Sequence, residues 1–332
     1  LRFFQDRIRF DVAYYDELTE NQIISLPIAI SSGYKEQVVN GGAVRSRGVE
    51  IVLGLTPVRN EHFQWNVLFN FSKNVSTVES LPEGSGKLTL AYSRIYDNVN
   101  QTVWFQVEEG GRIGDIYGTG YKKNENGDFL LTATGNHIVD NTLKKLGNYN
   151  PDFILGFNNQ IQYKNWSLDF LFDWRQGGIL ISRTLALAAV AGQLKETENR
   201  PAEGVAQGVV NTGTAENPVY VPNTVALPAE TYYRQYYDRN HEQNNTYDAT
   251  YIKLREFSLG YTFKTGEQGR GFLRNSHKLS VALIGRNLFA ISDMPHIDPE
   301  QLAVQGQQFV SGVENMSYAT SRSFGLKLGF DF

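Results

Sequence analysis

Apolar and polar residues alternate along long parts of this chain, and this pattern limits its fold more than any other feature. The final stretch, SRSFGLKLGFDF, places Phe324, Leu326, Leu328, Phe330 and Phe332 on every second position. Because a strand sends successive side chains to opposite faces, such a stretch has one apolar and one polar face. Seven further segments repeat the pattern, so we expect eight strands of about ten residues: 7–16, 47–55, 63–72, 151–164, 166–175, 256–263 and 278–287.

The connections between these strands distinguish two all-β folds. A soluble sandwich buries its apolar faces between two sheets, whereas a membrane barrel turns them toward lipid. Short or moderate links alternate with long ones, which cover residues 17–42, 77–150, 177–250 and 288–320. Outer-membrane barrels have this asymmetry, with brief periplasmic turns and extended outer loops. The sequence therefore predicts a transmembrane antiparallel β-barrel with long extracellular loops.

Composition excludes several classes of protein. The net charge of −4 gives no basic footprint for nucleic acid, so no nucleic-acid partner is expected. The chain has no cysteine, which rules out disulfides, a thiol nucleophile and cysteine-bound metal. No apolar stretch approaches the length of a transmembrane helix, and the run LALAAVAG near Leu185 fits a loop helix instead. No signal peptide is visible, and the chain begins in mid-pattern, so we expect a fragment of a longer protein.

Charged residues on the polar positions of the strands indicate a watery interior. Such side chains suit a wide, water-filled barrel and would be costly in a dry core. They either line a permeation path or form a hydrogen-bonded wall that contacts a plug. The expected lumen-lining residues are Asp169, Asp173, Arg175, Glu50 and Lys327.

Several segments together resemble the C-terminal portion of SusC/RagA-like TonB-dependent outer-membrane transporters of Bacteroidota. In chain order they are SRGVEI, GRIGDIYGTGYKKNENGDF, KLGNYNPDFILGFNNQIQYKNWSLDFLFDWRQGG, ATYIKLREFSLGYTF, LIGRNLFAISDMPHIDPE and SRSFGLKLGFDF. The resemblance implies a 22-stranded barrel occluded by an N-terminal plug, of which this chain supplies the last eight or so strands. Residues 1–332 would then be the C-terminal part of a single barrel domain, without the signal peptide, plug, TonB box and early strands.

The same resemblance implies function, location and partners. It implies active import of oligomeric nutrients across the outer membrane, glycan fragments first and peptides second. The implied partners are a SusD-like surface lipoprotein that acts as a lid, the TonB–ExbB–ExbD complex reached through the missing N-terminal part, outer-membrane lipid and the assembly machinery. A dimer of transporter–lid pairs is also implied. The sequence does not identify the cargo or any additional lipoprotein.

A tyrosine-rich stretch in the third long loop is the first candidate for binding substrate. TYYRQYYDRN carries Tyr232, Tyr233, Tyr236, Tyr237 and Arg234. Flat rings stack on sugars, and charged or amide side chains bond hydroxyl groups, while the same rings suit a peptide. The spacing also fits one face of a loop helix that packs inside the loop or against the lid. Trp104, in the second long loop, is a further candidate.

The terminal strand has a second interpretation. An alternating aromatic strand that ends in Phe resembles the signal read by the outer-membrane assembly machinery. This interpretation assigns an assembly role to Phe324, Leu326, Leu328, Phe330 and Phe332, while lipid contact alone also explains the alternation.

Enzymatic signatures are missing from the sequence. No Ser/His/Asp order, catalytic carboxylate pair or cofactor motif is present, so we expect no enzyme activity and no cofactor. The glycines of GRIGDIYGTG are interpreted as turn residues, and the HIDPE stretch (296–300) as a structural turn rather than a metal site. Two other functions stay open: a passive porin or structural barrel, and a soluble all-β carbohydrate-binding module.

Overall fold

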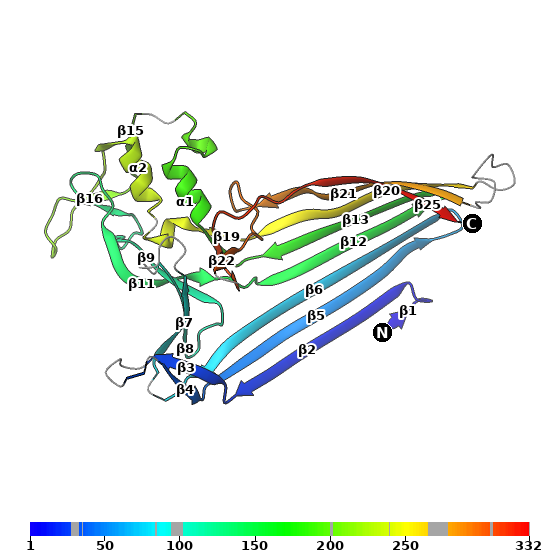
Figure 1. Cartoon of the computed structure of the whole chain (residues 1–332), viewed down its shortest axis with the longest axis horizontal. Coiled ribbons are helices and arrows are strands. Elements are labelled where there is room, and N and C mark those ends of the chain that lie inside the picture. The colour runs from blue at the N-terminus through cyan, green and yellow to red at the C-terminus, as the bar shows by residue number, and fades with distance from the viewer. Residues whose placement is uncertain are drawn as a thin grey trace.

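The computed structural model describes residues 1–27, 33–34, 36–83, 85–93, 102–199, 202–238, 240–264, 278–305 and 308–331. These residues form two regions, a long sheet and a compact assembly of loops at one end of it (Figure 1). We call the sheet the wall and the loop assembly the cap. No helix in the described ranges has the length and apolar character needed to cross a bilayer.

The wall is an antiparallel sheet whose described strands follow chain order, interrupted only by strands that belong to the cap. Its order is β1-β2-β5-β6-β12-β13-β20-β21-β25. The eight long strands agree with the eight expected from the sequence, and the two-residue β1 adds a ninth at the margin. Their bounds are β1 Arg2–Phe3, β2 Ile8–Glu20, β5 Ala43–Arg59, β6 Phe63–Ser80, β12 Phe153–Tyr163, β13 Trp166–Gln176, β20 Tyr251–Lys264, β21 Lys278–Ser292 and β25 Ser323–Asp331.

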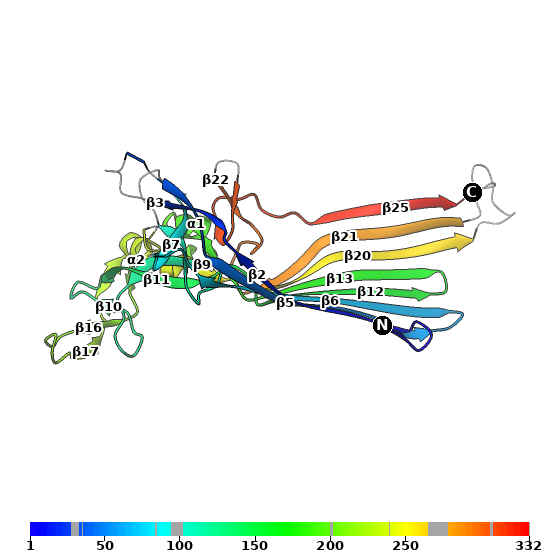
Figure 2. The same cartoon turned by 90° about the horizontal axis from the view of Figure 1, so that it is seen from below.

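Short turns close the wall at the end that also holds the described chain termini (Figures 1 and 2). Strands β12 and β13 are joined by two residues, and Lys164 adopts a positive φ of 51°. Such a backbone matches the twist of a tight hairpin. In the β5–β6 turn, the Asn60 Oδ1 atom accepts bonds from the backbone N–H groups of His62 at 3.0 Å and Phe63 at 2.8 Å. The two described links therefore lie at one end, as the sequence predicts, and the third, over residues 265–277, lies outside the described residues.

All four long connections lie at the opposite end and build the cap. Their strands form small separate sheets rather than extending the wall. The cap strands are β3 Ile23–Pro27, β4 Glu36–Asn40, β7 Lys87–Ser93, β8 Val103–Glu108, β9 Asp115–Tyr121, β10 Leu130–Leu131, β11 Val139–Asn148, β14 Ile179–Ser182, β15 Glu203–Val205, β16 Val209–Asn211, β17 Tyr220–Pro222, β18 Ala226–Pro228, β19 Thr246–Asp248, β22 Ala303–Gln305, β23 Gln308–Val310 and β24 Val313–Glu314. Its helices are α1 Arg183–Val190, η2 Lys195–Thr197, α2 Ala229–Tyr236 and η3 Glu242–Asn245.

Two hydrophobic core clusters of the molecule sit in the cap, and a third joins Val78 at the cap end of β6 to Leu88 and Val107. One cluster joins residues from the second, third and fourth long connections: Val103, Ile116, Ile181, Ala303 and Val313. A second cluster packs α1 against the ends of β20 and β21: Leu180, Leu185, Ala249 and Met294. Since these residues are far apart in the sequence, the long connections are held together as one packed unit. The run LALAAVAG lies in α1 and the turn that follows it, which confirms the expected loop helix.

The interpretation of the GRIGDIYGTG glycines as turn residues is only partly correct. Gly114 does lie in a turn, with a φ of 98°, but Gly118 and Gly120 lie within the buried strand β9. A Cβ atom at Gly120 would lie 1.9 Å from Gln243 Oε1. These two glycines therefore allow close packing inside the cap, which the sequence pattern did not reveal.

Candidate functional site

One face of the wall presents continuous apolar rows that run across its strands. The strand register places Phe157 opposite both Phe69 and Phe172. The whole row consists of Phe10, Leu53, Phe69, Phe157, Phe172, Leu254 and Phe289. No described protein layer covers this face, because Leu283 is 60% exposed and Ile291 is 65% exposed. Such a face is suited to hydrocarbon.

Aromatic residues mark both ends of this apolar face. Trp166 and Trp174 lie on it eight residues apart along β13, which corresponds to about 26 Å of strand. The apolar band of an outer-membrane barrel is about 25 Å tall. At the short-turn end, the rings of Trp166 and Tyr261 lie 4.8 Å apart, and Phe63 and Tyr163 add a second pair at 6.4 Å. These rings are positioned as an interfacial girdle would be.

The opposite face carries all five residues expected to line the lumen. Asp169, Asp173 and Arg175 alternate along β13, so they share this face. Glu50 lies in the same register row as Arg175, through Ser72 and Ile154. Lys327 lies in the row of Ser167, near the short-turn end. Along β13 these residues occupy two depths of the wall, so they form no single cluster.

Asp173 belongs to a network of charged side chains that ties the wall to the fourth long connection. Its Oδ2 atom accepts from the Arg255 guanidinium at 2.9 Å (Nε) and 2.5 Å (Nη2). Arg255 also donates to Glu300 Oε1 at 2.5 Å, and Lys253 donates to Glu300 Oε2 at 2.5 Å and to Asp298. Lys253 is buried, with 3% of its side chain exposed. The polar face thus carries a fully paired set of charges near the cap.

Sequence reasoning missed Lys253 and Arg255 for a definite reason. The register of β20 shifts at Arg255 relative to both neighbouring strands, which marks a β-bulge. Because a bulge adds one residue, Lys253 and Arg255 fall out of phase with the alternation that follows in β20. The bulge directs both cations toward the polar face, where Asp173 and Glu300 meet them.

The HIDPE stretch supplies two of the carboxylates of this network, Asp298 and Glu300, beside Asp173 of the wall. Asp298 and Glu300 pair with wall cations, while His296 Nε2 lies 2.9 Å from the Glu196 carboxylate of η2. Among the described residues, no group of three or more His, Asp or Glu side chains has the arrangement of a metal site. The stretch acts here as a structural connection between the wall and the cap.

The four candidate tyrosines lie in or directly after α2, where most of them pack against protein. The Tyr232 ring lies over the backbone of Gly204 in β15, at a distance that leaves no room for a Cβ atom there. The Tyr236 and His137 rings are 6.2 Å apart. Tyr233 contacts the Tyr232 ring at 5.0 Å. The helical interpretation of this stretch is confirmed, and all four rings have neighbours within the protein, since the Tyr236 and Tyr237 rings also lie 4.9 Å apart.

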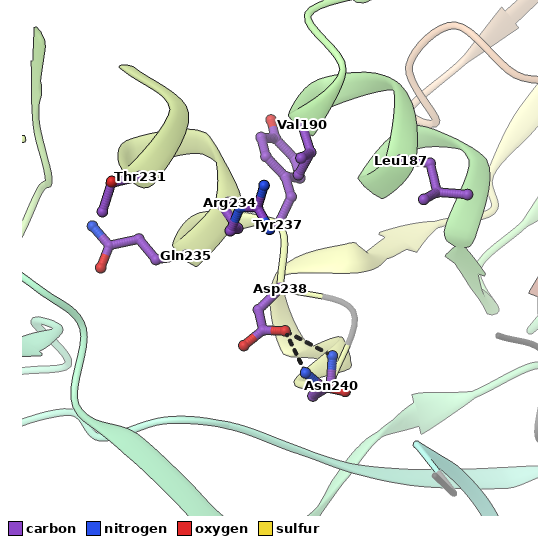
Figure 3. A pocket seen from close by; sticks show the side chains of 8 residues that line it. All are labelled: Leu187, Val190, Thr231, Arg234, Gln235, Tyr237, Asp238 and Asn240. Atoms are coloured by element: carbon purple, nitrogen blue, oxygen red, sulfur yellow. Dashed lines mark hydrogen bonds between the residues drawn. The ribbon is translucent and has the colours of Figure 1, made fainter. Parts of the chain in front are cut away.

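Tyr237 is placed differently, because it faces a cleft between α1 and α2. The cleft has a volume of about 590 Å³ and opens between Leu187 and Val190 of α1 and the residues at the end of α2 (Figure 3). Burial raises the pKa of Tyr237 to about 12, so the phenol stays protonated at neutral pH. Arg234 also lines the cleft and pairs with Glu230 at 2.7 Å.

Trp104 lies in β8, opposite Tyr92 and Tyr117 in the cap sheet, and is half-buried. It does not line the α1–α2 cleft, so the structure does not bring Trp104 together with the tyrosine stretch.

A buried ion pair inside the cap was also missed by the sequence analysis. The Arg183 Nη2 atom lies 2.5 Å from Glu242 Oε1, and the side chains are 1% and 0% exposed. Arg183 also donates to the Thr102 hydroxyl. Burial raises the pKa of Glu242 to about 7, against the opposing effect of Arg183. Because Arg183 and Glu242 lie far apart within the third long connection and Thr102 lies in the second, no local sequence pattern relates them.

The terminal strand β25 pairs with β21 and leaves its outer edge open. Phe324, Leu326, Leu328 and Phe330 lie on the apolar face, and Phe324 is 80% exposed. Phe332 lies outside the described residues. The positions expected for an assembly signal are therefore also positions expected to contact lipid.

Comparisons with known proteins give a consistent set of relatives. TonB-dependent receptor P3 of Formosa agariphila is 25% identical over 353 residues, which cover 99% of this chain and 33% of the receptor. TonB-dependent receptor SusC of Bacteroides thetaiotaomicron is 21% identical over 345 residues, covering 99% of this chain and 31% of SusC. No protein-family model matches the chain.

Among solved structures, the RagAB peptide importer in its open-open state has the same fold over nearly the whole chain. The TM-score is 0.67 at 18% identity, with 99% of this chain and 33% of that chain covered. A second structure, of the RagAB peptide transporter, gives a TM-score of 0.63 at 19% identity over 98% of this chain and 34% of the other. The chain thus spans about a third of the length of the relatives it matches.

Proposed function

We infer that this chain, a C-terminal barrel portion of a SusC/RagA-like TonB-dependent receptor in the bacterial outer membrane, takes part in the active import of oligomeric nutrients. The observation that carries this inference is the division of the wall into an apolar face and a charged face, with a packed cap at one end only. The similarity to TonB-dependent receptors extends over the same wall and cap. The relatives named above are receptors and importers rather than enzymes.

The wall and the cap would contribute differently to import. The wall keeps lipid on one side and presents polar groups such as Asp169 and Arg175 to a water-filled lumen. The Asp173–Arg255–Glu300 network fixes the fourth long connection against the wall, which favours a rigid barrel rim. The cap would receive the cargo through many weak polar and stacking contacts. The energy of transport would come from the TonB–ExbB–ExbD complex, which pulls on a plug located in the remaining part of the protein.

We further propose glycan fragments as the first cargo class and peptides as the second. The cap offers tyrosine rings and amide side chains rather than a concentration of one charge, which suits neutral oligomers. The peptide alternative has support from the RagAB importer, whose solved structures describe it as a peptide importer. A SusD-like lipoprotein lid and a dimer of transporter–lid pairs complete the proposal.

The terminal strand is proposed to serve both lipid contact and assembly. Its apolar side chains face outward along their whole described length, which leaves them accessible to an assembly factor before the barrel closes. Replacing Phe330 with Ala in the full-length protein should lower the amount of assembled barrel more than Leu283→Ala, at a position on the same apolar face in β21. Equal losses would assign β25 to lipid contact alone.

The proposed function is tested by uptake. We expect deletion of the full-length gene to abolish growth on one class of oligomer while leaving growth on its monomer intact. Uptake of a fluorescent oligomer should stop when the inner-membrane proton gradient is collapsed. Uptake that survives loss of the gradient would identify a passive porin, and uptake that survives the gene deletion would contradict an import role.

A further inference from the structure

The cleft between α1 and α2 has no role in the fold described above. We propose that this cleft is a binding site for a short segment of a neutral oligosaccharide. The proposal rests on the proposed function in one respect, since it takes the cap to be the surface that cargo meets first. It adds to the cargo class proposed above the location and the lining residues of a binding site.

The size and position of the cleft suit a small part of a long cargo molecule. Its volume of about 590 Å³ lies within the range of about 300–1,000 Å³ that is usual for small-ligand sites. It belongs to the third long connection, at the end of the molecule away from the short turns (Figures 1 and 3). A ligand in this cleft would therefore be held outside the membrane, before it enters the lumen.

The two sides of the cleft have different chemistry. Leu187 and Val190 of α1 form an apolar side, and the Tyr237 ring also lines the cleft (Figure 3). Arg234, Asp238 and Asn240 form a polar side with both donors and acceptors. A sugar ring has an apolar face of C–H groups and a rim of hydroxyls, so it matches an aromatic or aliphatic surface beside planar polar groups.

The polar side is held in place before any ligand binds. Asp238 Oδ1 accepts from the Asn240 backbone N–H at 2.9 Å and from Asn240 Nδ2 at 3.1 Å (Figure 3). The Asn245 Nδ2 atom donates to the Asp238 carbonyl oxygen at 3.0 Å, and Asn244 Nδ2 donates to the Tyr236 carbonyl oxygen at 3.0 Å. Because these bonds hold Asp238 and Asn240 in position, little ordering of these two side chains remains to oppose binding.

The charge and the backbone of the cleft favour a sugar over other oligomers. Arg234 and Asp238 contribute one positive and one negative charge to the lining, so neither a polyanion nor a polycation is favoured. Extended peptides commonly bind by adding a strand to an exposed sheet edge. The lining residues lie on α1, on α2 and in the turn after α2. Backbone N–H groups in helices already have hydrogen-bond acceptors; for example, the Tyr237 N–H donates to the Tyr233 carbonyl oxygen. The cleft therefore offers side chains rather than a backbone edge.

The test is a binding measurement on the full-length protein purified in detergent. The probes are linear neutral hexasaccharides of glucose, mannose, xylose and galactose, with uncharged hexapeptides as the competing class. Two variants change the cleft from opposite sides: Tyr237→Ala removes the ring, and Val190→Trp fills the space. Tyr233→Ala is the matched control, because Tyr233 lies on the same helix but does not line the cleft. Heat-dependent gel mobility verifies that every variant forms a barrel.

We expect at least one hexasaccharide to bind, with about tenfold weaker affinity in Tyr237→Ala and Val190→Trp and an unchanged affinity in Tyr233→Ala. The proposal is overturned if no hexasaccharide binds, or if all variants bind the hexasaccharide with equal affinity. It is also overturned if the two cleft variants lose binding of the hexapeptide but not of the hexasaccharide. The uptake test separates this failure from a failure of the proposed function. If the protein imports an oligomer, and the Tyr237→Ala and Val190→Trp variants bind that oligomer with normal affinity, the proposed binding site is wrong. The proposed import function is then unaffected.

Discussion

The wall and the cap are built from the same chain but are stabilised in opposite ways. Each long strand of the wall pairs with its neighbours in the sheet, and apolar side chains such as Leu283, Ile291 and Phe324 remain exposed. The cap buries apolar clusters that join separate long connections, and it also buries the Arg183–Glu242 ion pair within the third connection. A membrane supplies the apolar surroundings for the wall, whereas the cap stands in water and must supply its own. The two regions should therefore respond differently to the same kind of change.

Removing one member of the buried ion pair should have the largest effect, and only on the cap. Arg183→Met leaves the Glu242 carboxylate buried without its cation, which costs about 4 kcal/mol. Hydrogen exchange should become fast in residues 179–190 and 242–248 while the wall stays protected. The double variant Arg183→Met/Glu242→Leu should recover most of the loss, because it removes both charges. Equal destabilisation of the wall by Arg183→Met would show that the regions are not separate.

A charge on the lipid face should have the next largest effect, and only on the wall. Phe157→Lys places an ammonium in the middle of the apolar row between Phe69 and Phe172, which costs about 3 kcal/mol. We expect a marked fall in assembled barrel in the outer membrane, measured by heat-dependent gel mobility. Asn158→Lys, one residue away on the polar face, is the matched control and should assemble normally. Equal losses at 157 and 158 would remove the distinction between the two faces.

The cap should also have a pH dependence that comes from Glu242. The pKa of Glu242 is raised by burial from 4.5 to about 7. Since the folded cap holds this proton more tightly than the unfolded chain, Glu242 favours folding most below about pH 4.5. This contribution is lost as the pH rises through about 7. Cap stability should fall by about 2 kcal/mol from pH 5.5 to 7.5. Hydrogen exchange at several pH values measures this, and Glu242→Gln should flatten the curve.

The smallest expected effect concerns the junction of the two regions. Glu300→Gln keeps the shape of the side chain but weakens its bonds to Lys253 and Arg255, at a cost of about 1 kcal/mol. We expect faster exchange in residues 293–302 and no change in the buried cluster around Ile181. Unchanged exchange in 293–302 would show that this network does not fix the fourth connection to the wall.

The same comparison explains how much of the molecule the sequence predicted. The eight long strands and their apolar face follow from local alternation, because lipid contact repeats every second residue. The bulge at Arg255 interrupts that period, so the cations at 253 and 255 were not recognised. In the cap, α1 and α2 were expected, but the contact between Arg183 and Glu242 depends on folding of residues 59 positions apart. Long-range contacts of this kind leave no periodic trace in a sequence.

The central claim is that the apolar face of the wall contacts lipid and the charged face contacts water. The chain has no cysteine, so single cysteines can be placed at each position from 167 to 173 along β13 in the full-length protein, with any other cysteine replaced. Spin labels at these positions then report collisions with dissolved oxygen, which concentrates in lipid, and with a water-soluble nickel chelate. We predict strict alternation, with the nickel chelate reaching 167, 169, 171 and 173 and oxygen favouring 168, 170 and 172. Uniform accessibility, or the reverse alternation, would contradict the account.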